Sequence, residues 1–131
     1  MARAYSDGSP TIQPQHIVPR PAGIAEAILR GDPTRAYPYI RQITLESGGA
    51  IVSVSEAEIR EARQMVEELE GISICFSSAT AVAGVIKQVR QHGFPRNDTV
   101  MINLTGADRN INAIPDNVAW LRREGCDWRP E

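Results

Sequence analysis

Apolar positions recur at helical spacing in five parts of the chain and predict five helices. The clearest covers residues 55–71, where Ser55 and Glu58 are spaced as a capping box. Another begins at Ser77 or Ser78, whose hydroxyls can cap it, and is apolar on most sides, which predicts burial. It ends at Gly93, and the other three predicted helices, residues 22–30, 34–47 and 116–125, also end at a glycine.

Short runs of β-branched and apolar residues between these helices predict three strands, residues 50–54, 72–76 and 99–104. The last run is nearly continuous in apolar residues, as expected for a strand covered on both faces. Strands and helices therefore alternate, which is typical of an α/β fold. We expect three layers, with a largely parallel sheet between flanking helices.

The first 21 residues differ from the rest of the chain. They contain four prolines and little apolar periodicity, which predicts an extended arm that lies over a surface and builds no core. The expected organisation is therefore an N-terminal arm, residues 1–21, followed by an α/β portion, residues 22–131.

Composition narrows the function classes. With 131 residues and 42% hydrophobic residues, the chain can form one domain with a real core. A net charge of −2 and a pI near 5.7 give no electrostatic footprint for nucleic acid, and no apolar run approaches the roughly 20 residues that span a bilayer. We expect a cytoplasmic protein with neither nucleic acid nor membrane as a partner.

Metal and thiol chemistry are not expected. Cys75 and Cys126 lack the spacing of a zinc site or a disulfide framework, and His16 and His92 are isolated from each other. No histidine is placed by the sequence beside Cys75, so a small buried residue is the favoured interpretation of that cysteine.

Hydroxyl groups stand at two places where a ligand could bind. Thr105 and Gly106 directly follow the predicted strand 99–104, and ligands of parallel sheets lie outside the carboxyl ends of strands. Ser77 and Ser78 stand at a predicted helix N-terminus, which favours an anion. The alternatives are structural, since a threonine can satisfy backbone groups in a turn and a serine can cap a helix.

Charged residues offer further candidates. Asp108 and Arg109 follow the Thr105 turn, and an arginine can bind a substrate carboxylate in two-pronged fashion, although an exposed ion pair is the simpler interpretation. Lys87 is the only lysine, and its neighbours Gln88 and Arg90 indicate a solvated helix face. No glycine-rich run opens a helix, so the sequence shows no phosphate loop.

Several short motifs, taken in order, carry a resemblance. They are Ile24-Ala25, Gly31-Asp32-Pro33, Gly48-Gly49, Val54–Ile59, Glu70-Gly71-Ile72, Ser77-Ser78-Ala79, Ala83-Gly84 and Leu104-Thr105-Gly106. In this order and spacing the chain resembles the C-terminal portion of fold type II pyridoxal phosphate enzymes, in the threonine synthase-like branch of the tryptophan synthase beta superfamily. The sequence departs from that pattern at Cys75-Phe76, where many members have Glu-Pro, and after Gly106, where Ala107–Asn110 replace a glycine-rich continuation.

The resemblance implies a cofactor, pyridoxal 5'-phosphate, and residues that hold it. Thr105 would present its hydroxyl to the pyridine nitrogen, and Gly106, Ser77 and Ser78 would lie beside the ring. Arg109 is the candidate for the substrate. A neutral hydroxyl makes the ring a weaker electron sink than an aspartate would, which suits elimination and replacement.

The resemblance also implies a partner. In the family the Schiff-base lysine and the phosphate loop lie earlier in the sequence, and this chain has neither. The leading hypothesis is one subunit of a split lyase or synthase, oligomeric, acting by β/γ-elimination or replacement on an amino acid, with a complementary N-terminal-half chain carrying that lysine. A non-catalytic interaction or regulatory module derived from the fold and a piece of a longer enzyme are the alternatives.

Overall fold

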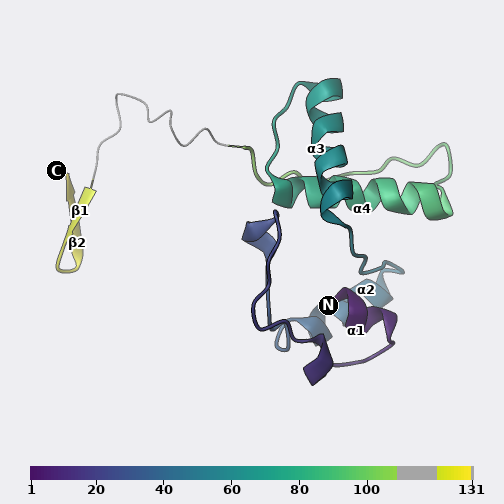
Figure 1. Ribbon diagram of the computed structural model, residues 1–131, viewed down its shortest axis with the longest axis horizontal. Coiled ribbons are helices and arrows are strands. Elements are labelled where there is room, and N and C mark those ends of the chain that lie inside the picture. Colours follow the sequence, from purple (N-terminus) through teal and green to yellow (C-terminus); the bar gives the residue numbers. More distant parts are fainter. Residues whose placement is uncertain (109–120, 131) are drawn as a thin grey trace.

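The computed structural model describes residues 1–108 and 121–130 and is rich in helix (Figure 1). The elements in chain order are α1 (Ala2–Ser6), η1 (Pro14–His16), η2 (Glu26–Ile28), α2 (Tyr37–Glu46), α3 (Glu56–Glu70), α4 (Phe76–His92), β1 (Leu121–Glu124) and β2 (Asp127–Pro130).

Helices α3 and α4 form the centre of the molecule and cross each other in Figure 1. The predicted capping box is confirmed, because the Ser55 hydroxyl accepts a bond from the Glu58 N–H and the Glu58 carboxylate accepts one from the Ser55 N–H, at 2.6 Å. Gly71, with φ of +65°, ends α3 as predicted. The residues that form the shared core are Ala25, Ile59, Ala62, Val66, Ile74, Ala79, Val82 and Ala83.

The prediction of an extended N-terminal arm is wrong for two stretches. Residues 2–6 form α1 and residues 14–16 form η1. Ala4, Ile12 and Tyr37 are buried together in a second, smaller core, and the burial of Ala4 favours a compact turn over an extended chain. The division of the chain into residues 1–21 and 22–131 stays a prediction.

The predicted helix over residues 22–30 is reduced to the single turn η2. Gly31 does not end a helix. Its carbonyl accepts a bond from the Val18 N–H, and a Cβ on Gly31 would lie 2.4 Å from the Val18 carbonyl oxygen. The glycine therefore allows two backbone segments to approach closely. The helix over residues 34–47 is confirmed as α2, with Gly48 at φ of +66° beyond its end.

The three predicted strands are not formed as strands in the described part of the chain. Residues 50–54 and 99–104 are irregular and have no ladder partner there, and residues 72–76 contribute only the antiparallel bridge between Ile74 and Ala107. A strand is stable only beside a neighbour that accepts its backbone hydrogen bonds. The prediction of a largely parallel sheet is therefore not confirmed by residues 1–108 and 121–130.

The described C-terminal residues form an antiparallel hairpin of β1 and β2, with Leu121 opposite Pro130 and Glu124 opposite Asp127. The prediction of a helix over residues 116–125 is wrong for its last part, and residues 116–120 lie outside the described residues. Gly125 has φ of +66° and serves the two-residue turn between the strands.

Candidate functional site

The turn that carries Thr105 lies against the N-terminus of α4. After α4 the chain reverses and runs back along the helix to its beginning (Figure 1). There the Gly106 N–H donates to the Ser78 hydroxyl at 2.9 Å, and that hydroxyl donates to the Gly106 carbonyl at 3.0 Å. The Cys75 N–H reaches the same carbonyl at 3.1 Å. The structure therefore brings together two groups that the sequence separates by 28 residues.

Gly106 is required at this contact for steric reasons. A Cβ on Gly106 would lie 2.7 Å from the Cys75 sulfur and 3.6 Å from the Ser78 oxygen. The first distance is shorter than carbon and sulfur atoms tolerate, so a side chain at position 106 would force the Cys75 side chain or the turn to move.

The prediction that Ser77 or Ser78 caps α4 is wrong. The helix begins at Phe76, its N-cap is Cys75, and no side chain makes a capping bond. The hydroxyl of Ser78 is 3% exposed and is engaged with Gly106, so it holds the turn. A direct contact of Ser78 with a cofactor stays a prediction.

Thr105 and Ser77 are the hydroxyls left accessible at this site. Thr105 is exposed on the turn, and Ser77 is half-buried in the first turn of α4. Among the described residues neither side chain has a hydrogen-bond partner. Arg109, the candidate for the substrate, lies outside the described residues, and its role stays a prediction.

Sequence reasoning missed Arg63 of α3. Its guanidinium pairs with the carboxylate of Asp108, donates to the Ser73 hydroxyl at 3.4 Å and lies over the ring of Phe76, 4.7 Å from the centroid. The only signal in the sequence was an arginine between the buried positions Ala62 and Val66 of an amphipathic helix. Asp108 is therefore in an ion pair, which was the simpler interpretation of this residue from the sequence.

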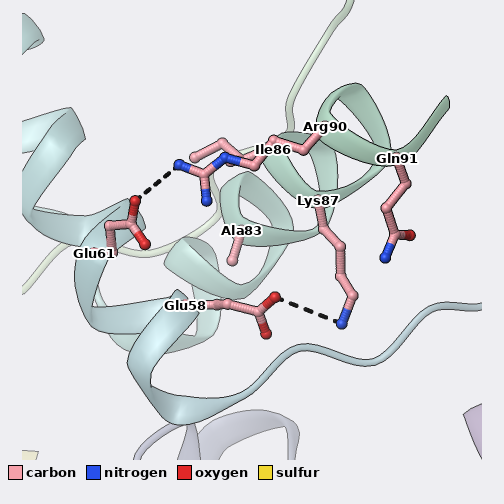
Figure 2. A pocket seen from close by; sticks show the side chains of 7 residues that line it. All are labelled: Glu58, Glu61, Ala83, Ile86, Lys87, Arg90 and Gln91. Atoms are coloured by element: carbon pink, nitrogen blue, oxygen red, sulfur yellow. Dashed lines mark hydrogen bonds and ion pairs between the residues drawn. The ribbon is translucent and has the colours of Figure 1, made fainter. Parts of the chain in front are cut away.

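Lys87 is bound into the structure more firmly than its polar neighbours predicted. Its ammonium donates to the Ser53 carbonyl at 2.8 Å and lies 3.5 Å from the Glu58 carboxylate. Figure 2 shows this ion pair beside a second one, between Arg90 and Glu61 at 2.9 Å. The two pairs join α3 to α4 around a pocket of about 140 Å³. The lysine therefore ties helices together, and only 29% of its side chain is exposed.

Cys75 stands at the N-cap of α4 with its sulfur 3.5 Å from the Ser78 oxygen. Polar contacts with the Ser78 side chain and with nearby backbone N–H groups lower the pKa of the Cys75 thiol, and partial burial opposes them. Cys75 and Cys126 are both free thiols.

Histidine and acidic residues form no metal-binding group of three or more in the described part of the chain. His16 is instead buried in the N-terminal segment, where its Nδ1 accepts from the Gln13 N–H and its Nε2 lies 3.0 Å from the Asp7 carboxylate. None of the described helices is long and apolar enough to cross a membrane.

Comparison with known proteins places this site in a family context. The chain is 36% identical to a threonine synthase of Methanosarcina acetivorans over 81% of its length and 33% identical to a threonine synthase of Bacillus sp. strain ULM1 over 77%. A cysteate synthase of Methanosarcina acetivorans is 32% identical over 55% of the chain. These matches cover 25%, 28% and 18% of the relatives, so the chain spans about a quarter or less of their length.

A family model described as pyridoxal-phosphate dependent enzyme matches residues 1–106. The match begins at residue 1 and ends at Gly106, so it includes the N-terminal segment and the whole contact between α4 and the turn. The predicted resemblance is thereby confirmed, and an α/β enzyme domain is consistent with it. The cofactor of these enzymes is pyridoxal phosphate, and this chain belongs to the pyridoxal-phosphate dependent enzyme family.

Proposed function

We propose that this chain is one part of a threonine synthase-like lyase or synthase that is completed by a separate chain. The reaction would be a β- or γ-elimination or replacement on an amino acid such as O-phosphohomoserine or O-phosphoserine. The partner would carry the Schiff-base lysine and the phosphate loop, and the assembled enzyme would be a cytoplasmic oligomer.

The Thr105 turn carries this proposal. Its hydroxyl is exposed while the neighbouring Gly106 backbone is held on both its N–H and its carbonyl by Ser78. A hydroxyl on a fixed turn can donate to the pyridine nitrogen of pyridoxal phosphate, which acts as an electron sink when bound. The residues of the turn therefore fit one edge of the cofactor.

The other edges of the cofactor need groups from elsewhere. Lys87 already donates to Ser53 and pairs with Glu58 between two helices. Freeing its ammonium would break both contacts. The matched relatives are about four times longer than the aligned region, which leaves ample sequence for a lysine and a phosphate loop on the complementary part.

An open surface of α4 supports a partner. Val52 is 40% exposed and Phe94 is 45% exposed, and both line a groove of about 480 Å³ with Gly84 and Val85 of α4. Residues 50–54 beside it have no ladder partner in the described chain. Apolar surface next to backbone that lacks a ladder partner favours a partner that adds strands.

Within this assembly Thr105 would donate its proton in a hydrogen bond to the ring nitrogen and would leave that nitrogen uncharged. Gly106 would keep the turn close to α4, and Ser78 would fix its direction. The pyridine ring would then withdraw electrons from the substrate only moderately, which suits departure of a leaving group at the β or γ carbon better than transamination.

The test is co-purification with the product of a neighbouring reading frame that contains a glycine-rich loop and a lysine. With pyridoxal phosphate added, we expect the mixture to show the near-visible absorption of lysine-bound cofactor and the separate chains to lack it. Thr105→Val in the complex should shift the absorption maximum, because the hydroxyl donor is lost.

Lys87→Arg is the matched control, since it keeps the charge that pairs with Glu58 and removes any reactive amine. The complex with this variant should bind the cofactor as the wild type does. Covalent binding of the cofactor by this chain alone through Lys87 would overturn the split-enzyme proposal. A stable complex of the two chains without cofactor would favour the non-catalytic interaction module instead.

A further inference from the structure

The turn that carries Thr105 has a second anchor on α3, and we propose that Arg63 is a positioning residue that fixes where the Thr105 hydroxyl lies. This inference rests on the proposed function, in which that hydroxyl meets the cofactor ring. Ser78 of α4 holds Gly106, and Arg63 holds Asp108 two residues further along.

The Arg63 guanidinium contacts the side chains of three other residues. It forms an ion pair with Asp108, a hydrogen bond to Ser73 and a stack over Phe76. The Asp108 N–H also donates to the Ser73 carbonyl at 3.0 Å, so Arg63 and Asp108 meet the same segment. The Arg63 side chain is 23% exposed and the Asp108 side chain is 50% exposed, so the guanidinium end of the pair is the one shielded from water.

A turn anchored at one residue can pivot, whereas a turn anchored at two has a fixed direction. Backbone bonds of Gly106 and Asp108 hold the main chain beside Cys75 and Ser73, but they leave the side-chain end of the turn without an anchor. Asp108 supplies the second fixed point because its carboxylate and its N–H are both bound. Arg63 therefore acts on the Thr105 hydroxyl through Asp108 and touches neither cofactor nor substrate.

Phe76 and Asp108 stand at the two places where the sequence departs from the resembled pattern. Arg63 contacts both, so the two departures form one cluster in space. A planar guanidinium can stack on an aromatic ring and bind a carboxylate at the same time, which a lysine ammonium cannot match. The cluster therefore ties the start of α4 and the residue after the Thr105 turn to the same side chain of α3.

A charge swap on the full chain tests the inference. We expect Arg63→Asp and Asp108→Arg, each alone, to speed amide hydrogen exchange at Gly106 by about fivefold, while exchange at Val66 in α3 stays unchanged. The double variant should restore Gly106 to within about twofold of wild type, because the pair re-forms with opposite polarity. Arg63→Met is the milder variant should the aspartate disturb α3, and it should give the same local acceleration.

Arg60→Asp is the matched control. Arg60 lies on the same helix and over the same Phe76 ring, at 5.4 Å, and it should leave exchange at Gly106 unchanged. In the complex with the partner chain, the single charge variants should shift the absorption maximum of bound pyridoxal phosphate and the swap should return it, which a role in stability alone would not produce.

The outcomes separate the two proposals. Unchanged exchange at Gly106 in both Arg63 variants overturns the inference, whatever the complex does. Equal acceleration at Gly106 and Val66 in Arg63→Met also overturns it, because Arg63 would then stabilise α3 in general. Faster exchange at Gly106 alone, with rescue by the charge swap, supports the anchor. Failure of every mixture of chains to bind pyridoxal phosphate would overturn the proposed function only.

Discussion

The two faces of α4 differ in how completely this chain covers them. On one face Ala79 is fully buried and Val82 and Ala83 are less than one-tenth exposed against α3 and its surroundings. On the other face Ala81 is exposed, and Gly84 and Val85 line an open groove. The expectation that α4 would be buried on most sides is correct for the first face only.

This difference shows which part of the structure is complete within the chain. The covered face has its own core, two interhelical ion pairs and the bonded turn that presents Thr105. The open face has small residues, which would let another element approach closely. Substitutions matched between the two faces can therefore test the comparison directly.

The largest effect is expected when a large side chain is added to the covered face. Ala79→Leu should lower the free energy of unfolding by about 3 kcal/mol, because the three added carbon atoms cannot fit at a fully buried site. Ala81→Leu makes the same change on the open face and should stay within about 0.5 kcal/mol. Urea denaturation of the full chain measures both, and equal losses would contradict the distinction between the faces.

Two glycines, one at the Thr105 turn and one on the open face of α4, should change the free energy of unfolding in opposite directions when replaced by alanine. Gly106→Ala should cost about 2 kcal/mol, since its Cβ would lie 2.7 Å from the Cys75 sulfur. Gly84→Ala should stabilise the chain by about 0.5 kcal/mol, because alanine favours helix and its Cβ would lie 3.7 Å from Val52, at ordinary contact distance. Thermal and urea unfolding report both changes. Destabilisation by Gly84→Ala would mean that the groove is already closed in solution.

Helix α3, which packs against the covered face of α4, depends on its N-terminal cap. Ser55→Ala removes the hydroxyl that accepts the Glu58 N–H at 3.3 Å, and it should lower the free energy of unfolding by about 1 kcal/mol. Ser53→Ala, in the irregular segment before α3, is the control and should change it by less than about 0.5 kcal/mol. A loss as large for Ser53 as for Ser55 would show that the cap is not what stabilises α3.

Helices α2, α3 and α4 were predictable because their signals are local. The Ser55–Glu58 spacing, Gly71 and Gly48 mark helix ends within a few residues of sequence. The Thr105 turn and Ser78 are far apart in the sequence. The family pattern placed both beside the cofactor but did not predict the hydrogen bonds between Gly106 and Ser78. The strands were mispredicted because a β-branched run signals a strand but cannot supply the neighbour it needs.

Arg63 and Gly31 show what sequence patterns do not contain. An arginine on an amphipathic helix is ordinarily a solvated residue, and its contact with Asp108 exists only because the chain returns 45 residues later. Gly31 looks like a helix stop, but its φ is not positive and its role is close approach to Val18. Both roles depend on which distant segment packs beside the residue.

The smallest effect concerns the pKa of the Cys75 thiol at the N-cap of α4. In a Cys126→Ser background, alkylation of Cys75 by iodoacetamide should reach half its maximal rate below the ordinary thiol pKa of about 8.5, because Ser78 and backbone N–H groups stabilise the thiolate. Ser78→Ala should move that midpoint back up. The lowered pKa of the folded state also means that the thiolate's contribution to stability is complete above the ordinary thiol pKa and is lost as the pH falls through the lowered value. An unchanged midpoint in Ser78→Ala would contradict the contact between Cys75 and Ser78, and with it the close packing of the turn against α4.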